Sequence, residues 1–306
     1  MTTLVFGHLS PDTDSTGSPI IWAWYLSQIK GIEAEAVLLG EPNTEANFVL
    51  KRWNLTKPRI ISKIDKNQSV VIVDTNNPAE LPAAINDADI TTIIDHHKLV
   101  GGIETKNPIN IRIEPLACTA TIMHKLIDKD LEKAPDAIKG AMLSCILSDT
   151  LEFRSPTTTD EDRAVATALA HDLGTDITLL ASEMFAAKSD VSAFSDTELL
   201  LLDSKKYTVD NTNFRISVLE TTAPNVILNR KANLMAAMVD VANNSDVDQV
   251  LMFVVDILNE EAIMLLPNDL TKTIAEKSFG VTVSDDTVIL PGVMSRKKQI
   301  IPNLKK

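Results

Sequence analysis

Four short stretches in the first third of the chain are apolar at successive positions, which is typical of strands buried on both faces. These stretches are residues 4–6, 36–39, 70–73 and 90–94. Segments in which apolar residues recur at helical spacing lie between them. The helix-like stretches are residues 18–30, 44–53 and 79–84. Because strand and helix patterns alternate, we expect right-handed crossovers and a parallel sheet.

From Cys118 to Ala187 the pattern becomes helical, as in ATIMHKLIDKDL and APDAIKGAMLSCIL. Strand patterns then return. They occupy residues 215–219, 250–255 and 262–266, with helical patterns at 230–243 and 272–279. A chain of 306 residues is long enough for two domains. We therefore predict an α/β protein with three segments. They are a larger domain over 1–187 with a parallel sheet flanked by helices, a polar linker or hinge over 188–196, and a smaller α/β domain with a mixed sheet over 197–306.

The composition is that of a folded globular protein, with 44% hydrophobic and 23% charged residues. The formal net charge of −13 disfavours a nucleic-acid partner, because such binding depends on neutralising phosphates. Cys118 and Cys145 are too few for a disulfide framework, and we expect both to be buried apolar residues. The first residues, MTTLVFGHLSPDTD, lack a signal-peptide pattern, and no apolar run approaches the ~20 residues of a membrane span. We expect a cytoplasmic protein that does not associate with membranes.

Acidic and histidine side chains follow three of the predicted strands. The first strand runs into GHLSPDTDS, the third ends in Asp74-Thr75-Asn76, and the fourth ends in Asp95-His96-His97. A helical run adds Ser148-Asp149-Thr150. Ligands of parallel α/β sheets bind beyond the carboxyl ends of the strands, so these groups should meet at one rim. The remaining histidines, His124 and His171, lie within helical patterns and should be structural or surface residues.

Each group also has a purely structural interpretation. Asp12 or Ser15 could cap a helix, Asp74 could shape a turn, Asp149 could cap a helix, and Asp95 could lie in a solvated loop. Three successive strand ends carrying acids or histidines make these separate explanations less probable together than one shared site.

The ligand set contains imidazole and carboxylate but no thiolate. It suits Mn²⁺, Co²⁺ or Mg²⁺ and argues against a structural zinc cage. Five carboxylates are too many for one ion. Two ions about 3.5–4 Å apart, sharing bridging carboxylates, would use them and would activate a water for attack on a phosphoryl group. The sequence therefore predicts a phosphohydrolase.

These motifs resemble the DHH phosphoesterase superfamily. GHLSPDTDS, DTN at Asp74, DHH at Asp95 and SDT at Ser148, together with SRKKQ at Ser295, are similar to the manganese-dependent, family II inorganic pyrophosphatases. The similarity spans essentially the whole chain. It implies the DHH fold in the first domain, a substrate-binding second domain, and hydrolysis of pyrophosphate to two orthophosphates.

The resemblance also implies roles for individual residues. His8 and Asp12 would bind one metal, Asp14, His96 and Asp149 the other, and Asp74 would bridge both. His97 would approach the substrate and assist proton transfer, while Asp95 would orient its neighbours.

In the second domain, Arg296 and Lys297 match the family's pyrophosphate-binding pair, and Lys205 matches a phosphate-binding lysine, with Lys206 as the alternative. The resemblance further implies two Mn²⁺ per subunit, with Co²⁺ possible, Mg²⁺ delivered with substrate, a homodimer, and closure of the domains about the linker.

Three alternatives remain open from the sequence. A DHH phosphodiesterase would share the metal motifs, but GGGH-type substrate motifs are absent from this sequence. A short-chain polyphosphatase would cleave the same linkage. A non-catalytic metal-binding module would be expected to have lost a ligand, and every motif position is present.

Overall fold

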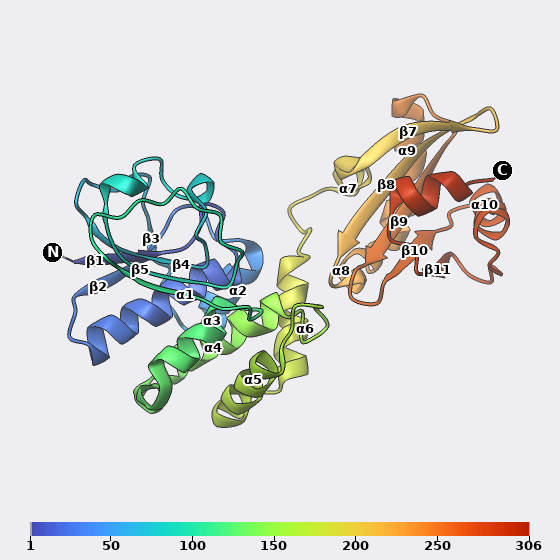
Figure 1. Ribbon diagram of the computed structural model, residues 1–306. Coiled ribbons are helices and arrows are strands. Elements are labelled where there is room, and N and C mark those ends of the chain that lie inside the picture. Colours follow the sequence, from blue (N-terminus) through green and yellow to red (C-terminus); the bar gives the residue numbers. More distant parts are fainter. Residues whose placement is uncertain (1, 306) are drawn as a thin grey trace. The chain divides into compact units, whose positions relative to one another are not determined.

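The chain forms two compact units, Met1–Lys188 and Ser189–Lys306. Figure 1 shows their secondary structure in a computed structural model that describes residues 2–305. Within this described part, no helix combines the length and the apolar composition required to cross a membrane.

The first unit is built on a six-stranded, fully parallel sheet in the order β3-β2-β1-β4-β5-β6. Its strands are β1 (Thr3–Phe6), β2 (Ala34–Leu38), β3 (Arg59–Ile60), β4 (Ser69–Val73), β5 (Asp89–Asp95) and β6 (Asn110–Ile113). The four predicted strands and the parallel sheet are confirmed. The chain builds outward from β1 in one direction and then returns to place β4 on its other side, so β1, β4 and β5 are neighbours at a topological switch point.

Helices α1, α3 and α4 lie together on one side of this sheet (Figure 1). The helices are α1 (Thr13–Trp24), α2 (Thr44–Arg52), α3 (Thr119–Ile127), α4 (Asp136–Asp149), α5 (Asp160–Leu173) and α6 (Ile177–Lys188). The predicted helical region after Cys118 is confirmed. Helix α1 begins five residues earlier than the pattern indicated, because Asp12 caps it, and it continues into a π-helical turn at Tyr25–Ile29.

The opposite face of the sheet is covered by loops and short 3-10 turns. Phe6, Val37 and Ile72 pack there against Leu81 and Ile85. The predicted helix over 79–84 is wrong, because only the 3-10 turn Pro78–Glu80 reaches this stretch, and the next 3-10 turn, Ile85–Asp87, begins after it. Pro82 accounts for the interruption. Its ring disfavours helical backbone in the preceding residue, and Leu81 is extended, with φ −120° and ψ 163°.

The second unit is a mixed five-stranded sheet in the order β11-β10-β9-β8-β7, in which β8 and β9 are parallel and the other pairs antiparallel. Its strands are β7 (Ser204–Val209), β8 (Thr212–Thr221), β9 (Gln249–Asp256), β10 (Glu261–Leu265) and β11 (Thr287–Pro291). Its helices are α7 (Asp196–Leu202), α8 (Pro224–Leu228), α9 (Lys231–Ser245) and α10 (Asp269–Phe279), with a π-helical turn η5 (Arg296–Ile300) and a 3-10 turn η6 (Ile301–Asn303). The mixed sheet is confirmed.

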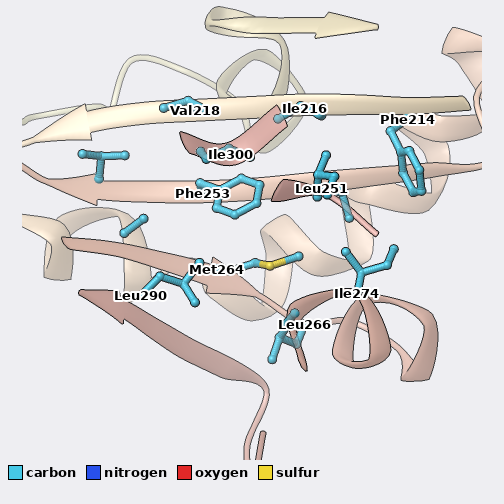
Figure 2. Close-up of a cluster of buried hydrophobic side chains, with 14 residues drawn as sticks. Phe214, Ile216, Val218, Leu251, Phe253, Met264, Leu266, Ile274, Leu290 and Ile300 are labelled. Atoms are coloured by element: carbon cyan, nitrogen blue, oxygen red, sulfur yellow. The ribbon is translucent and has the colours of Figure 1, made fainter. Parts of the chain in front are cut away.

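Central strand β9 is buried on both faces, and its alternate residues enter two different cores. Leu251 and Phe253 belong to the core that includes Ile274 of α10 and Ile300 of η5, shown in Figure 2. The intervening residue Met252 belongs to the core beneath α7 and α9. Elements η5 and α10 therefore cover one face of the sheet, and the other helices cover the opposite face.

The segment that follows Lys188 is held by side chains of the second unit. Ser189 Oγ contacts the hydroxyls of Thr221 at 2.7 Å and Thr222 at 3.1 Å. The Arg230 guanidinium donates to the carbonyls of Val191 and Phe194. Residues 189–194 thus have defined hydrogen bonds within their own unit, although they form no helix or strand.

Candidate metal centre

The loop from β1 to α1 brings three ligand-type side chains to the end of the central strand. Its tight path requires Gly7, because a Cβ there would lie 1.9 Å from Ser15 Oγ, and that hydroxyl accepts a hydrogen bond from the His8 backbone N–H. Asp12 Oδ1 caps α1 by accepting from the Ser15 N–H at 2.9 Å. The capping interpretation of Asp12 is confirmed, and its second oxygen, Oδ2, lies 3.8 Å from His8 Nε2.

Asp74 lies at the centre of the cluster, at the end of β4. Its Oδ2 is 3.5 Å from His8 Nε2, and its Oδ1 is 3.4 Å from His96 Nε2. The backbone of Asp74 has φ 58°, a left-handed conformation that is uncommon outside glycine, and its N–H donates to the Ile94 carbonyl. This strained backbone places one carboxylate between two histidines that come from different strand ends.

His96 faces a second pair of carboxylates. Its Nδ1 is 3.2 Å from the Leu116 carbonyl, which fixes the proton on Nδ1 and leaves Nε2 as a free ligand. Asp14 accepts from Ser18 Oγ and from the Thr119 N–H. Ligand atoms of Asp14, His96 and Asp149 lie within 4.8 Å of one another.

The described residues form three overlapping groups in which all ligand atoms lie within 4.8 Å of one another. They are His8, Asp12 and Asp74; Asp14, His96 and Asp149; and Asp74, His96 and His97. The six residues predicted to bind metal are thus brought together, whereas His124 and His171, on α3 and α5, belong to none of these groups.

The chemistry of the cluster fits cations. Asp149 Oδ2 is buried and has no hydrogen-bond partner among the described residues. A buried carboxylate oxygen without a donor is costly unless a cation lies against it. Burial, reinforced by the charge of Asp14, raises the pKa of both Asp74 and Asp149 well above the usual carboxyl range. Bound divalent ions would give Asp149 Oδ2 a partner and would stabilise the ionised forms of Asp74 and Asp149.

The pair His8 and Asp12 shows the opposite balance. Burial opposes charge on each group, but the contact between them outweighs it, so the pKa of His8 is raised and the pKa of Asp12 is lowered. A metal ion would replace the proton on His8 and keep Asp12 ionised.

Asp95 is fully buried and accepts hydrogen bonds from His97 and Asn76. Its Oδ1 accepts from His97, and its Oδ2 accepts from the Asn76 amide. Asn76 Oδ1 in turn accepts from the Val100 N–H. The idea that Asp95 is a solvated loop residue is wrong, whereas the His97 side chain is 53% exposed and accessible from solvent.

Two hydrogen-bonding residues of this centre were not singled out from the sequence. Thr119 donates its N–H to Asp14 and its hydroxyl to Asp74, the latter at 3.3 Å. Ser18 donates to Asp14 from one helical turn further along α1. Thr119 begins α3 shortly after β6, so its position past another strand end could have indicated it. Ser18 carries no such indication.

The predicted substrate cations lie in the second unit. Arg296 begins η5, and its guanidinium donates to the Asp203 carbonyl at 2.9 Å and to Asp203 Oδ1 at 2.8 Å. Lys297 follows it on the same turn. The SRKKQ run is therefore part of a folded element, anchored by Ile300 in the core of Figure 2.

Lys205 and Lys206 are both exposed on edge strand β7 but point to opposite faces of the sheet. Tyr207 and Val209 pack against the core that contains Ile300. Lys205 has the same parity as these two residues and so lies on the face that η5 covers. Lys206 faces the other way.

Comparisons with known proteins identify two family domains along the chain. Residues 2–149 match the DHH family, N-terminal domain, and residues 182–306 match the DHHA2 domain. A protein of Deinococcus radiodurans named as a probable manganese-dependent inorganic pyrophosphatase is 40% identical, covering 99% of this chain and 97% of the relative. A protein of the same name from Lactobacillus acidophilus is 36% identical, covering 98% of this chain and 96% of the relative.

Solved structures are also similar. The crystal structure of a putative family II inorganic pyrophosphatase from Methanococcus jannaschii aligns with a TM-score of 0.61 and 30% identity, covering 99% of this chain and 98% of that one. An exopolyphosphatase-related protein from Bacteroides fragilis aligns with a TM-score of 0.52 at 12% identity, covering 98% of this chain and 89% of that one, which is a likeness of fold alone.

Proposed function

Because the chain belongs to the family of manganese-dependent inorganic pyrophosphatases, we propose that it hydrolyses inorganic pyrophosphate to two orthophosphate ions. The observation that carries this proposal is Asp74, whose two carboxylate oxygens face His8 and His96 separately. One carboxylate shared by two ligand groups is the arrangement expected of a dinuclear centre for phosphoryl hydrolysis.

Two Mn²⁺ ions per subunit are proposed, with Co²⁺ as a possible substitute and Mg²⁺ accompanying the substrate. His8 and Asp12 would hold the first ion, Asp14, His96 and Asp149 the second, and Asp74 both. When bound, the ions supply Lewis acidity and lower the pKa of a water that attacks phosphorus.

The chain's own side chains would then serve the reaction. Asp95 fixes His97 through its Nδ1, so Nε2 of His97 is the atom that can hold or release a proton beside the substrate. Arg296, Lys297 and Lys205 are proposed to bind the substrate phosphates, because fixed cations neutralise charge that develops on the leaving group.

Within that set, Lys205 is the lysine supported over Lys206. It shares a face of β7 with the side chains that pack toward η5, whereas Lys206 points to the opposite face.

The proposal is tested by phosphate release from pyrophosphate, tripolyphosphate and a dinucleotide, each with Mn²⁺, Co²⁺ and Mg²⁺. Pyrophosphate with Mn²⁺ should be hydrolysed far faster than the dinucleotide. Equal or faster cleavage of the dinucleotide would establish the phosphodiesterase alternative, and a preference for tripolyphosphate would establish the polyphosphatase. The homodimer and the cytoplasmic location stay predictions, to be checked by sedimentation analysis and by cell fractionation.

A further inference from the structure

A further buried carboxylate, Glu45, lies among the segments that carry the metal ligands. Glu45 is at the start of α2 and is fully buried. Its Oε2 accepts from Thr13 Oγ1 at 2.9 Å and from Ser148 Oγ at 2.7 Å. Glutamate is almost never fully buried without a specific partner, so its presence here needs a reason.

The two hydroxyls that reach Glu45 come from distant parts of the sequence. Thr13 stands between the ligands Asp12 and Asp14, and Ser148 immediately precedes Asp149. One oxygen of Glu45 therefore joins the β1–α1 loop, which contributes to both proposed metal sites, to the end of α4, which contributes to the second.

The arrangement is unfavourable for stability taken by itself. Glu45 Oε1 is buried without a hydrogen-bond partner among the described residues. Lys188 Nζ lies 3.5 Å from Oε2, but the Lys188 side chain is 40% exposed, so solvent weakens this pairing. A buried charge that is only partly compensated costs stability, and an apolar side chain of similar size would avoid that cost.

We infer that Glu45 is a positioning residue for the dinuclear centre: through Thr13 and Ser148 it fixes the spacing between Asp12 and Asp14 on one side and Asp149 on the other. Residues that hold metal ligands in place commonly change metal affinity 10- to 100-fold when they are replaced. This inference rests on the proposed function for its biological meaning, but its test measures metal binding directly.

The test is calorimetric titration of the full-length, metal-free protein with Mn²⁺. Glu45→Ala should weaken Mn²⁺ binding by about 10- to 100-fold. Glu45→Gln keeps an acceptor oxygen for both hydroxyls. Its Mn²⁺ affinity should stay within about threefold of that of the parent protein, a smaller change than the loss of a hydrogen bond to a charged group would cause.

Single-hydroxyl variants examine each connection separately and protect the test against misfolding of Glu45→Ala. Ser148→Ala should weaken only one of the two Mn²⁺ binding steps, because it releases only the Asp149 segment. Thr13→Val should weaken both steps, because it releases the loop that carries Asp12 and Asp14. Wild-type affinities in both variants would overturn the inference.

The matched control is Ile127→Ala, a truncation of a buried side chain at the last residue of α3, the opposite end of that helix from Thr119. It should lower the thermal midpoint and leave the Mn²⁺ titration unchanged. If Ile127→Ala lost as much Mn²⁺ affinity as Glu45→Ala at the same loss of stability, Glu45 would be structural only. Absence of pyrophosphate hydrolysis by the parent protein would refute the proposed function without altering either binding result.

Discussion

One oxygen of Asp95, Oδ1, accepts hydrogen bonds from both donors of His97, the backbone N–H at 3.1 Å and ring Nδ1 at 2.9 Å. The buried carboxylate thereby fixes the tautomer of an imidazole whose other edge faces solvent. The hydrogen bond that His97 donates to Asp95 raises the pKa of His97, so this histidine gains its proton more readily than a free one.

Replacing Asp95 with Asn should lower the pKa of His97 and reduce kcat by about 10- to 100-fold, because the carboxylate that charges and orients the imidazole is lost. Mn²⁺ affinity should change little. The pKa is measured by NMR titration of the ring protons in the metal-free protein. Asp89→Asn, at the other end of β5, is the control, and an unchanged kcat in Asp95→Asn would contradict the assigned role.

Asp74→Asn should reduce pyrophosphate hydrolysis by at least on the order of a thousandfold and weaken Mn²⁺ binding, because one residue serves both proposed sites. The metal-free variant should nevertheless be as stable as the parent, since burial already raises the pKa of Asp74 and favours a neutral side chain. Thermal unfolding with and without Mn²⁺ separates the two effects. The control Asp65→Asn, at an exposed position, should change neither pyrophosphate hydrolysis nor Mn²⁺ binding.

Mn²⁺ binding should release protons, and its affinity should rise with pH. Asp74 and Asp149 have raised pKa values in the metal-free fold, and both must be ionised to bind. Calorimetric titrations in two buffers of different ionisation enthalpy measure the protons released. Equal apparent binding enthalpies in the two buffers would mean that no protons are released, and would contradict the raised pKa values.

The same pKa shifts predict how metal-free stability depends on pH. A carboxyl whose pKa is raised on folding binds more protons in the folded state, so stability falls as pH rises above the unfolded value of ~3.9 toward the folded value. Saturating Mn²⁺ should reduce this decline. Urea unfolding across that range, with and without Mn²⁺, is the measurement.

Arg296→Ala should raise KM for pyrophosphate about tenfold or more while leaving Mn²⁺ binding unchanged, because the lost cation lies in a different unit from the ligands. Asp203→Ala should raise KM less, since it frees the Arg296 guanidinium without removing it. Reduced Mn²⁺ affinity in Arg296→Ala would refute the proposed division of roles.

Lys205→Ala and Lys206→Ala form a matched pair on adjacent positions of β7. The first should raise KM, and the second should have little effect, because their side chains point to opposite faces of the sheet. Steady-state kinetics with pyrophosphate compares them at the same loss of charge. The reverse order would identify Lys206 as the phosphate ligand.

In the first unit, the sequence predicted the strands that are buried and missed the strands that are exposed. Strands β1 and β4 were found because each contains a continuous apolar run, and β5 was found because isoleucines and β-branched threonines fill it. Edge strands β3 and β6 are largely exposed, so no periodic burial marks them. The false helix at 79–84 arose because apolar spacing was weighed without the effect of Pro82 on Leu81.

Ligand types were predictable because strand ends and residue chemistry are visible in the sequence, whereas the hydrogen bonds that hold the ligands are not. Glu45 reaches Ser148 across 103 positions, and its sequence neighbours resemble an ordinary helix start. Leu151, Glu152 and Phe153, just after Asp149, all have positive φ without any glycine. Such a left-handed turn depends on tertiary contacts and has no residue pattern of its own.

The order of the sheet has a consequence for synthesis of the chain. Strand β1 is made first but occupies the middle of the sheet, and its neighbour β4 and the helix ending at Asp149 follow much later. While the chain is still emerging from the ribosome, His8, Asp12 and Asp14 have no partners with which to close around an ion. Completion of the proposed metal centre therefore requires the first 149 residues to have left the exit tunnel, by which time more than 149 of the 306 residues have been translated.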